Sequence, residues 1–174
     1  MKHILLLSIL FIIFSCNHQK GGEDTYPNGK FSADTSGESL YTTDADDRGM
    51  NNAMEAARQN LVLFDRALKS ADSNFYGFAI KKRFAVGDSG EHIWLNHVRF
   101  YKDGYKAVIN NEPIIANNIK LGDTVFVTKN QISDWMYIDK NILRGGYTMR
   151  VELKRMSARV KAEFLKGLDY KIEE

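Results

Sequence analysis

The sequence has a single cysteine, Cys16, among its 174 residues. One cysteine cannot form an internal disulfide, so the fold must rest on a packed core. Ten phenylalanines, eight tyrosines and two tryptophans can supply that core. A strong excess of one charge is also absent, because 24 lysines and arginines oppose 22 acidic residues and leave a net charge of +2. We therefore predict one domain and no nucleic-acid partner, for which a basic stripe is expected.

The motifs of common enzyme and metal sites are missing as well. There is no HExxH motif, no GxSxG elbow, and no GxGxxG or phosphate-binding loop. His92 and His97 are five positions apart, which places them on opposite faces of an unbroken strand. A bulge near Asn96 would bring them to one face. Two histidines without a third ligand predict no metal site, and nothing predicts a cofactor.

The longest apolar run, residues 4–14, is too short to cross a membrane as a helix, which needs about 20 residues. It follows the basic start Met1-Lys2-His3 and leads into Ser15 and Cys16. A basic start, a short apolar stretch and a small residue before the cleavage point are typical of an export signal. The end of this segment resembles a bacterial lipobox, which implies cleavage before Cys16 and lipid on its sulfur. An ordinary signal peptide and a buried helix with an incidental cysteine are the alternatives.

Residues 1–15 are accordingly predicted to be a lipoprotein signal peptide, and lipid on Cys16 is predicted to hold the protein in the bacterial cell envelope. Asn17 stands where an aspartate favours inner-membrane retention in enteric bacteria, and Glu23-Asp24 resembles a weak acidic surface-export tag. Both features favour the outer membrane over the inner one. Residues 16–43 are rich in Gly, Ser, Thr, Asp and Asn, which predicts a disordered tether.

Residues 44–174 are predicted to form a single domain that begins and ends with a helix. In the first helix, apolar residues recur at spacings of three and four, and an aspartate at 44, 46 or 47 can cap its start. These apolar residues are Met50, Met54, Ala57, Leu61, Phe64 and Leu68. The closing helix carries the stripe Val160, Phe164 and Leu168, and Ser157 can cap it.

Between the two helices the apolar period changes to two, which predicts strands. The expected strands cover residues 75–86, 91–101, 105–109, 124–127 and 147–154, and residues 131–139 add a further apolar segment. Short local connections favour antiparallel pairing. We therefore predict an α+β fold, with a curved antiparallel sheet or small open barrel of about five strands and the N-terminal and C-terminal helices packed on it.

Six short segments between about residues 75 and 168 follow one another in an order and spacing that is hard to obtain by chance. They are GEHIWL at 90–95, NNEP at 110–113, LGD at 121–123, ISDWMY at 132–137, GGYTMR at 145–150 and RM at 155–156. Together they resemble the bacterial YegJ-like family, known as domain of unknown function 2314. The resemblance implies a shared fold, and it supplies no activity and no catalytic residues.

One of these segments also suggests a binding site. If residues 134–137 are extended, Trp135 and Tyr137 share one face and Asp134 lies on the other. An aromatic pair beside a carboxylate can grip a sugar or a peptide. Alternatively, Trp135 fills the core, while Asp134 caps a local turn or pairs with Arg150 or Arg155.

The candidate binding face consists of polar and aromatic residues from the segments that resemble the family: Glu91, His92, Trp94, Asn111, Asp134, Trp135 and Tyr137. We predict a membrane-tethered envelope lipoprotein whose domain binds an envelope protein or a cell-wall ligand without catalysing a reaction. The first alternative is an envelope enzyme of hydrolase type that uses Glu91, His92 and Asp134. The second is a structural spacer.

Overall fold

The computed structural model describes residues 24–26, 29–33, 39–43, 47–70 and 72–173. The chain divides into two units, Met1–Ala45 and Asp46–Glu174. Cys16 and the predicted signal peptide lie outside the described residues. Among the residues that are described, no helix is both long and apolar enough to cross a membrane.

The described part of the first unit consists of three short strands. They are β1 (Asp24–Tyr26), β2 (Gly29–Ala33) and β3 (Ser39–Thr43), joined in one antiparallel sheet in that order. The sequence predicts a disordered tether over residues 16–43, and the structure describes backbone pairing at thirteen of these positions. A role as a tether stays a prediction.

The second unit opens with two helices, α1 (Arg48–Gln59) and α2 (Leu61–Ser70). Asp47 caps α1, because its Oδ1 accepts the Met50 N–H at 3.0 Å. This confirms one of the three predicted caps. The helix that the sequence predicts as continuous breaks at Asn60, whose carbonyl accepts the N–H of Leu63. The predicted stripe still points inward on both sides of the break, since Ala57 and Phe64 are fully buried.

Six antiparallel strands form an open sheet in the order β7-β6-β5-β4-β8-β9. Their bounds are β4 (Phe75–Val86), β5 (Ser89–Tyr101), β6 (Gly104–Ile109), β7 (Thr124–Thr128), β8 (Ile132–Asp139) and β9 (Ile142–Gly145). A short 3-10 helix, η1 (Lys129–Gln131), joins β7 to β8. The α+β class and the antiparallel pairing are confirmed, with one strand more than the five predicted.

Strand β9 is not among the strands that the sequence predicts. It pairs with β8 across a two-residue turn in which Lys140 and Asn141 have φ of 48° and 65°. Positive φ at both central residues matches the right-handed twist of a hairpin, and Asn-Gly or Asp-Gly usually signals it. Lys140-Asn141 is neither of these dipeptides, so the usual sequence signal does not predict this hairpin.

The predicted strand at 147–154 is wrong, because this segment is helix α3 (Tyr147–Arg155). Its alternation of apolar and polar residues is typical of a strand, yet the carboxylate of Asp134 accepts the N–H groups of Tyr147 and Thr148 at 3.1 and 2.8 Å. These bonds satisfy the first turn of a helix. Helix α4 (Ala158–Lys166) follows, and the Ser157 Oγ accepts the Val160 N–H, as predicted.

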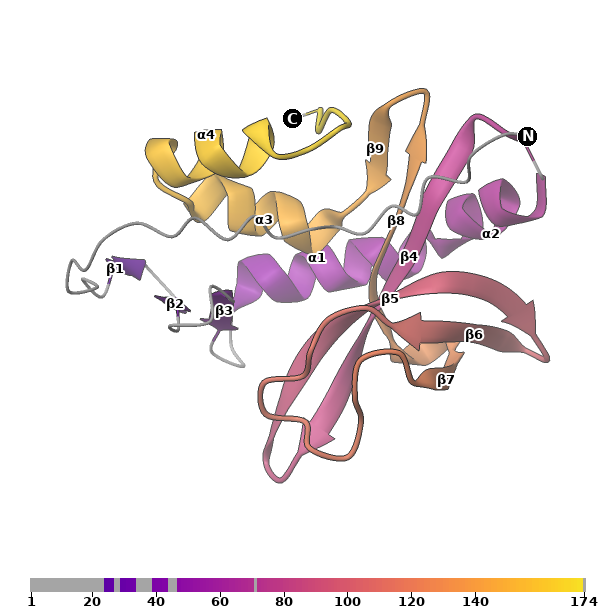
Figure 1. Cartoon of the computed structure of the whole chain (residues 1–174), viewed down its shortest axis with the longest axis horizontal. Helices are drawn as coiled ribbons and strands as arrows, with labels where there is room; N and C mark the ends of the chain where they lie inside the picture. The colour runs from indigo at the N-terminus through magenta and orange to yellow at the C-terminus, as the bar shows by residue number, and fades with distance from the viewer. Residues whose placement is uncertain (1–23, 27–28, 34–38, 44–46, 71, 174) are drawn as a thin grey trace. The chain divides into compact units, whose positions relative to one another are not determined.

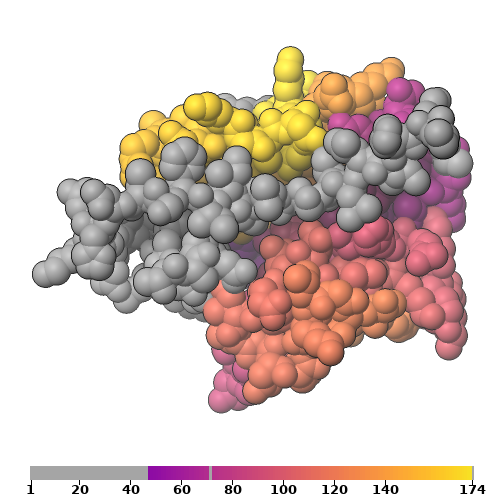
Figure 2. Space-filling view, viewed as in Figure 1, coloured from indigo at the N-terminus to yellow at the C-terminus, as the bar shows by residue number. Residues whose placement is uncertain are grey.

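The core lies on both faces of the sheet. The larger cluster packs α1 and α2 against β4 and β8, where the Phe64 ring lies 5.7 Å from the Trp135 ring. A smaller cluster on the other face includes Met136, Ile138 and Leu143. Figure 1 shows α3 and α4 beside β8 and β9, with β6 and β7 at the opposite end of the sheet. Figure 2 shows α4 and the C-terminal residues as the yellow surface above, and β5 to β7 within the salmon-to-orange surface below.

Candidate functional site

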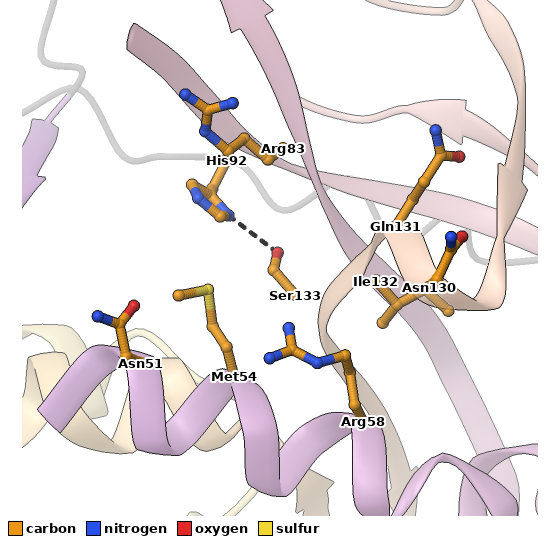
Figure 3. A pocket seen from close by; sticks show the side chains of 9 residues that line it. All are labelled: Asn51, Met54, Arg58, Arg83, His92, Asn130, Gln131, Ile132 and Ser133. Atoms are coloured by element: carbon orange, nitrogen blue, oxygen red, sulfur yellow. Dashed lines mark hydrogen bonds between the residues drawn. The ribbon is translucent and has the colours of Figure 1, made fainter. Parts of the chain in front are cut away.

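A pocket of about 410 Å³ opens between α1 and the strands β4, β5 and β8. Its lining comes from four parts of the chain that the fold brings together (Figure 3). The lining residues are Asn51, Met54, Arg58, Arg83, His92, Asn130, Gln131, Ile132 and Ser133. Two guanidinium groups, an imidazole and three amides thus share one hollow, and none of the described carboxylates lines it.

The two arginines differ in their surroundings. Arg58 donates to Glu55 one turn earlier in α1, with Nη2 and Oε2 2.8 Å apart, and this ion pair is exposed. Its charge is therefore partly compensated. Arg83 has no carboxylate partner among the described residues. The pocket accordingly contains one uncompensated guanidinium group.

Gly90 positions that guanidinium group. Arg83 pairs with His92 across β4 and β5, and Gly90 lies diagonally beside it on the same side of the sheet. A Cβ built on Gly90 would come within 2.5 to 2.7 Å of the Arg83 guanidinium atoms. The absent side chain of Gly90 therefore leaves the space that the Arg83 head occupies.

His92 is oriented from β8. Its Nδ1 lies 2.9 Å from the Ser133 Oγ, and that Oγ lies 3.1 Å from the Lys81 carbonyl oxygen. A carbonyl only accepts, so Ser133 donates its one proton to Lys81 and accepts from His92. The Nδ1 therefore carries the ring proton, and Nε2 is the nitrogen that titrates. Burial, followed by the charges of Lys81 and Arg83, lowers the pKa of His92 to about 4, although the residue is partly exposed to solvent.

Glu91 points to the opposite face from His92, because neighbouring residues of a strand alternate. Its buried carboxylate accepts the N–H groups of Ile114, Ile115 and Ala116 at 2.9 to 3.1 Å. These three donors belong to the connection between β6 and β7. Glu91 thus fixes this loop to the sheet, and its carboxylate is fully engaged in doing so.

Asp134 is 0% exposed. Besides the Tyr147 and Thr148 N–H groups, it accepts the Trp135 N–H at 2.8 Å and the Thr148 hydroxyl at 2.7 Å. Burial raises the pKa of Asp134, while the bonds from Thr148 and the charge of Lys81 oppose that rise. Neither Arg150 nor Arg155, its two predicted partners, bonds to it, since Arg150 donates to backbone carbonyls and Arg155 to Asp47. Asp134 is a buried cap of α3.

The aromatic residues of the candidate binding face lie on different faces of the sheet. Trp135 is 1% exposed, and its Nε1 donates to the Ala57 carbonyl at 2.7 Å. Tyr137 stacks on Trp135 with ring centroids 6.1 Å apart. Trp94 lies on the other face, half-buried, with the Lys81 Nζ 5.4 Å from its ring centroid. The core position that the sequence offers for Trp135 is confirmed.

The structure does not bring the seven candidate residues to one site. Glu91, Trp135 and Tyr137 lie on one face of the sheet, His92, Trp94 and Asp134 on the other, and Asn111 is exposed in the loop after β6. Of the seven, His92 alone lines the pocket. Sequence reasoning missed Arg83, Arg58 and the amides, because no pattern predicts where α1 crosses the sheet. The one available signal is Gly90, which lies diagonally across from the basic residue Arg83.

Strand β5 contains the bulge that would bring the two histidines to one face. Pairing with β6 shifts between Asn96 and Arg99, and His97 has a φ of 49°. Leu95 and Val98 both point into the core, so the strand changes phase between them and His97 comes to the same face as His92. The two histidines nevertheless line separate hollows. Within the described residues, no group of three or more His, Cys, Asp or Glu side chains is arranged to hold a metal ion.

Fold and pocket thus define a small bacterial α+β domain, and residues 47–170 match the family described as an uncharacterized protein conserved in bacteria, DUF2314. The chain belongs to this family, as its sequence motifs predict. The uncharacterized protein YegJ of Escherichia coli K12 is 31% identical over 112 residues, which are 64% of this chain and 72% of YegJ. A putative ankyrin repeat protein of Neisseria meningitidis serogroup B, NMB1133/NMB1171, is 30% identical over 132 residues, which are 71% of this chain and 52% of that protein. No solved structure matches the chain.

Proposed function

We propose that this protein is an exported lipoprotein of the bacterial cell envelope, anchored by lipid on Cys16, whose domain binds a small anionic ligand without catalysing a reaction. The observation that carries the ligand class is the lining of the pocket. Arg58, Arg83 and His92 all line it, and no carboxylate of the described residues does. The outer membrane is favoured over the inner one by Asn17 after the cysteine.

An anionic ligand would supply the negatively charged partner that Arg83 lacks among the described residues. A guanidinium group donates two parallel hydrogen bonds to a carboxylate or a phosphate, and such charge-assisted bonds are about twice as strong as neutral ones. The amides of Asn130 and Gln131 offer further donors at the same rim. Because Gly90 has no side chain, the Arg83 head has room to lie beside it on the sheet.

Binding without catalysis is supported by how the polar groups are engaged. In a hydrolase, a histidine accepts the proton of the attacking hydroxyl group. Here Ser133 is buried and donates its proton to the Lys81 carbonyl, while His92 donates to Ser133. The remaining members of the predicted enzyme set, Glu91 and Asp134, hold the β6–β7 loop and α3. No acid–base pair therefore faces the pocket.

The ligand class is tested by isothermal titration of the full-length protein, in a neutral detergent, with citrate and with inorganic phosphate. At least one of these anions should bind to the parent. Arg83→Gln should weaken that binding at least about tenfold, because a hydrogen bond to a charged group contributes about 1.5–3 kcal/mol. Lys154→Gln is the matched control, since it removes the same charge from an exposed position of α3. Equal affinities of the two variants, or no binding of either anion, would contradict the proposal.

The lipid anchor is tested separately. Cys16→Ala should abolish incorporation of labelled palmitate and leave the chain uncleaved or mis-sorted, whereas Ser8→Ala in the apolar run should label like the parent. Palmitate labelling and membrane partition that survive in Cys16→Ala would refute the lipoprotein assignment, whatever the titrations show.

A further inference from the structure

A second hollow, of about 300 Å³, lies on the sheet at β5, β6 and β7, away from the pocket of Figure 3. Arg99, Tyr101 and Lys106 line this hollow, and with Lys102 and Phe126, which contact the Tyr101 ring, they form what we call the basic–aromatic face. We propose that the basic–aromatic face binds an acidic polysaccharide. This inference does not depend on the pocket or on its proposed ligand.

The strand register gathers these side chains on one side of the sheet. Arg99 pairs with Lys106, and Lys106 pairs with Phe126, so the three form a row across β5, β6 and β7. Paired residues of antiparallel strands project to the same side, with neighbouring strands about 4.8 Å apart. The bulge at His97 turns Arg99 to this side, and Tyr101 projects to the same side because it lies two positions after Arg99. Without that bulge, the outer half of β5 would present its core residues here.

Positively charged groups and aromatic rings lie close together on the basic–aromatic face. The Lys106 Nζ lies 4.1 Å from the Tyr101 ring centroid, and the Lys102 Nζ lies 5.5 Å from the same centroid. The Phe126 ring meets the Tyr101 ring edge to face, with centroids 5.9 Å apart. Both rings are 38% exposed, so part of each apolar surface faces solvent.

Stability of the fold does not account for this arrangement. Arg99, Lys102 and Lys106 have no carboxylate partner among the described residues, and Asp103, in the adjoining turn, does not line the hollow. Clustered like charges repel one another. Lysines often protect the edge strand of a sheet from pairing, but Lys106 lies on β6, which has neighbours on both sides. An external anion would relieve this repulsion.

The occupant must offer negative charges and flat apolar surfaces at short intervals. A polymer of uronic acids does so, because each ring has an apolar C–H face and carries a carboxylate. Acidic peptides lack the rings. Single-stranded nucleic acid is held mainly through its phosphates by a basic groove, for which the net charge of the whole chain, only +2, gives little support.

The test measures binding of oligogalacturonate to the full-length protein in a neutral detergent, beside three matched polymers. Fully methyl-esterified oligogalacturonate keeps the rings and loses the charges, polyglutamate keeps charges without the rings, and oligothymidylate represents nucleic acid. We expect oligogalacturonate to bind most tightly and its binding to weaken with salt. Equal binding of polyglutamate or oligothymidylate, or undiminished binding of the methyl ester, would overturn the proposal.

Two variants place the binding on the basic–aromatic face. Lys106→Gln and Tyr101→Ala should each weaken oligogalacturonate binding at least about fivefold, which corresponds to about 1 kcal/mol. Lys166→Gln, an exposed lysine of α4, controls for the loss of one positive charge. Melting temperatures are measured beside the affinities, and Tyr101→Phe keeps the ring should the alanine variant unfold. If Lys106→Gln binds like Lys166→Gln, the face is not the binding site.

Discussion

The surroundings of Asp134 and the pocket around Arg83 satisfy their charged groups in opposite ways. Asp134 is fully buried and accepts three backbone N–H groups and one hydroxyl group. Arg83 lies at the surface without a carboxylate partner among the described residues. A buried charge must be satisfied within the protein, whereas a surface cation is free to meet a ligand. Asp134 therefore builds the fold, and Arg83 is available for recognition.

The largest effect should come from the core side of this comparison. Trp135→Ala should lower the free energy of unfolding by about 3–5 kcal/mol, because it removes a fully buried ring that packs on Phe64 and Tyr137. Trp94→Ala, at a half-buried position, should cost clearly less. Urea denaturation of both variants checks this. If the Trp135→Ala protein were as stable as the parent, the core assignment of Trp135 would be wrong, and its segment would instead belong to a recognition surface.

Asp134→Asn should come next, with a loss of about 1–3 kcal/mol. The amide nitrogen of the variant would face an N–H group that the carboxylate now accepts, so at least one buried donor would lose its partner. A simple turn cap would tolerate asparagine. Glu55→Gln, in an exposed ion pair, is the control and should change stability little. Equal melting of the two variants would contradict the capping role.

The sequence predicts the local features of this fold better than its long-range ones. The caps at Asp47 and Ser157 and the bulge near Asn96 each depend on neighbouring residues, and the structure contains all three. The sequence pattern predicts a strand where the structure has helix α3. The start of this helix is determined by Asp134, which lies thirteen positions before Tyr147. The pocket was missed for the same reason: α1 supplies Arg58 and β4 supplies Arg83, and only the tertiary fold brings them together.

A smaller effect is expected from acid. The pKa of His92 is lowered from 6.5 to about 4, so the unfolded chain binds a proton more readily than the folded one between these values. The stability that His92 contributes is therefore complete above about pH 6.5 and is lost as the pH falls toward 4. His92→Gln should flatten the fall in melting temperature between pH 7 and 4.5. A parallel fall in parent and variant would show that His92 is protonated equally in both states.

Gly90→Ala should change stability least, by less than about 1 kcal/mol, because the new Cβ meets only the movable end of the Arg83 side chain. The variant keeps every charge and displaces the guanidinium group alone. Gly167→Ala, where a Cβ would meet nothing closer than 3.5 Å, is the matched control.

The most direct test of the account is therefore titration of citrate and phosphate into these two glycine variants. If the pocket recognises anions through a guanidinium group that Gly90 positions, Gly90→Ala should lose most of the affinity while melting like the parent, and Gly167→Ala should bind as the parent does. An unaltered affinity in Gly90→Ala would contradict the assignment of Arg83 and of this pocket.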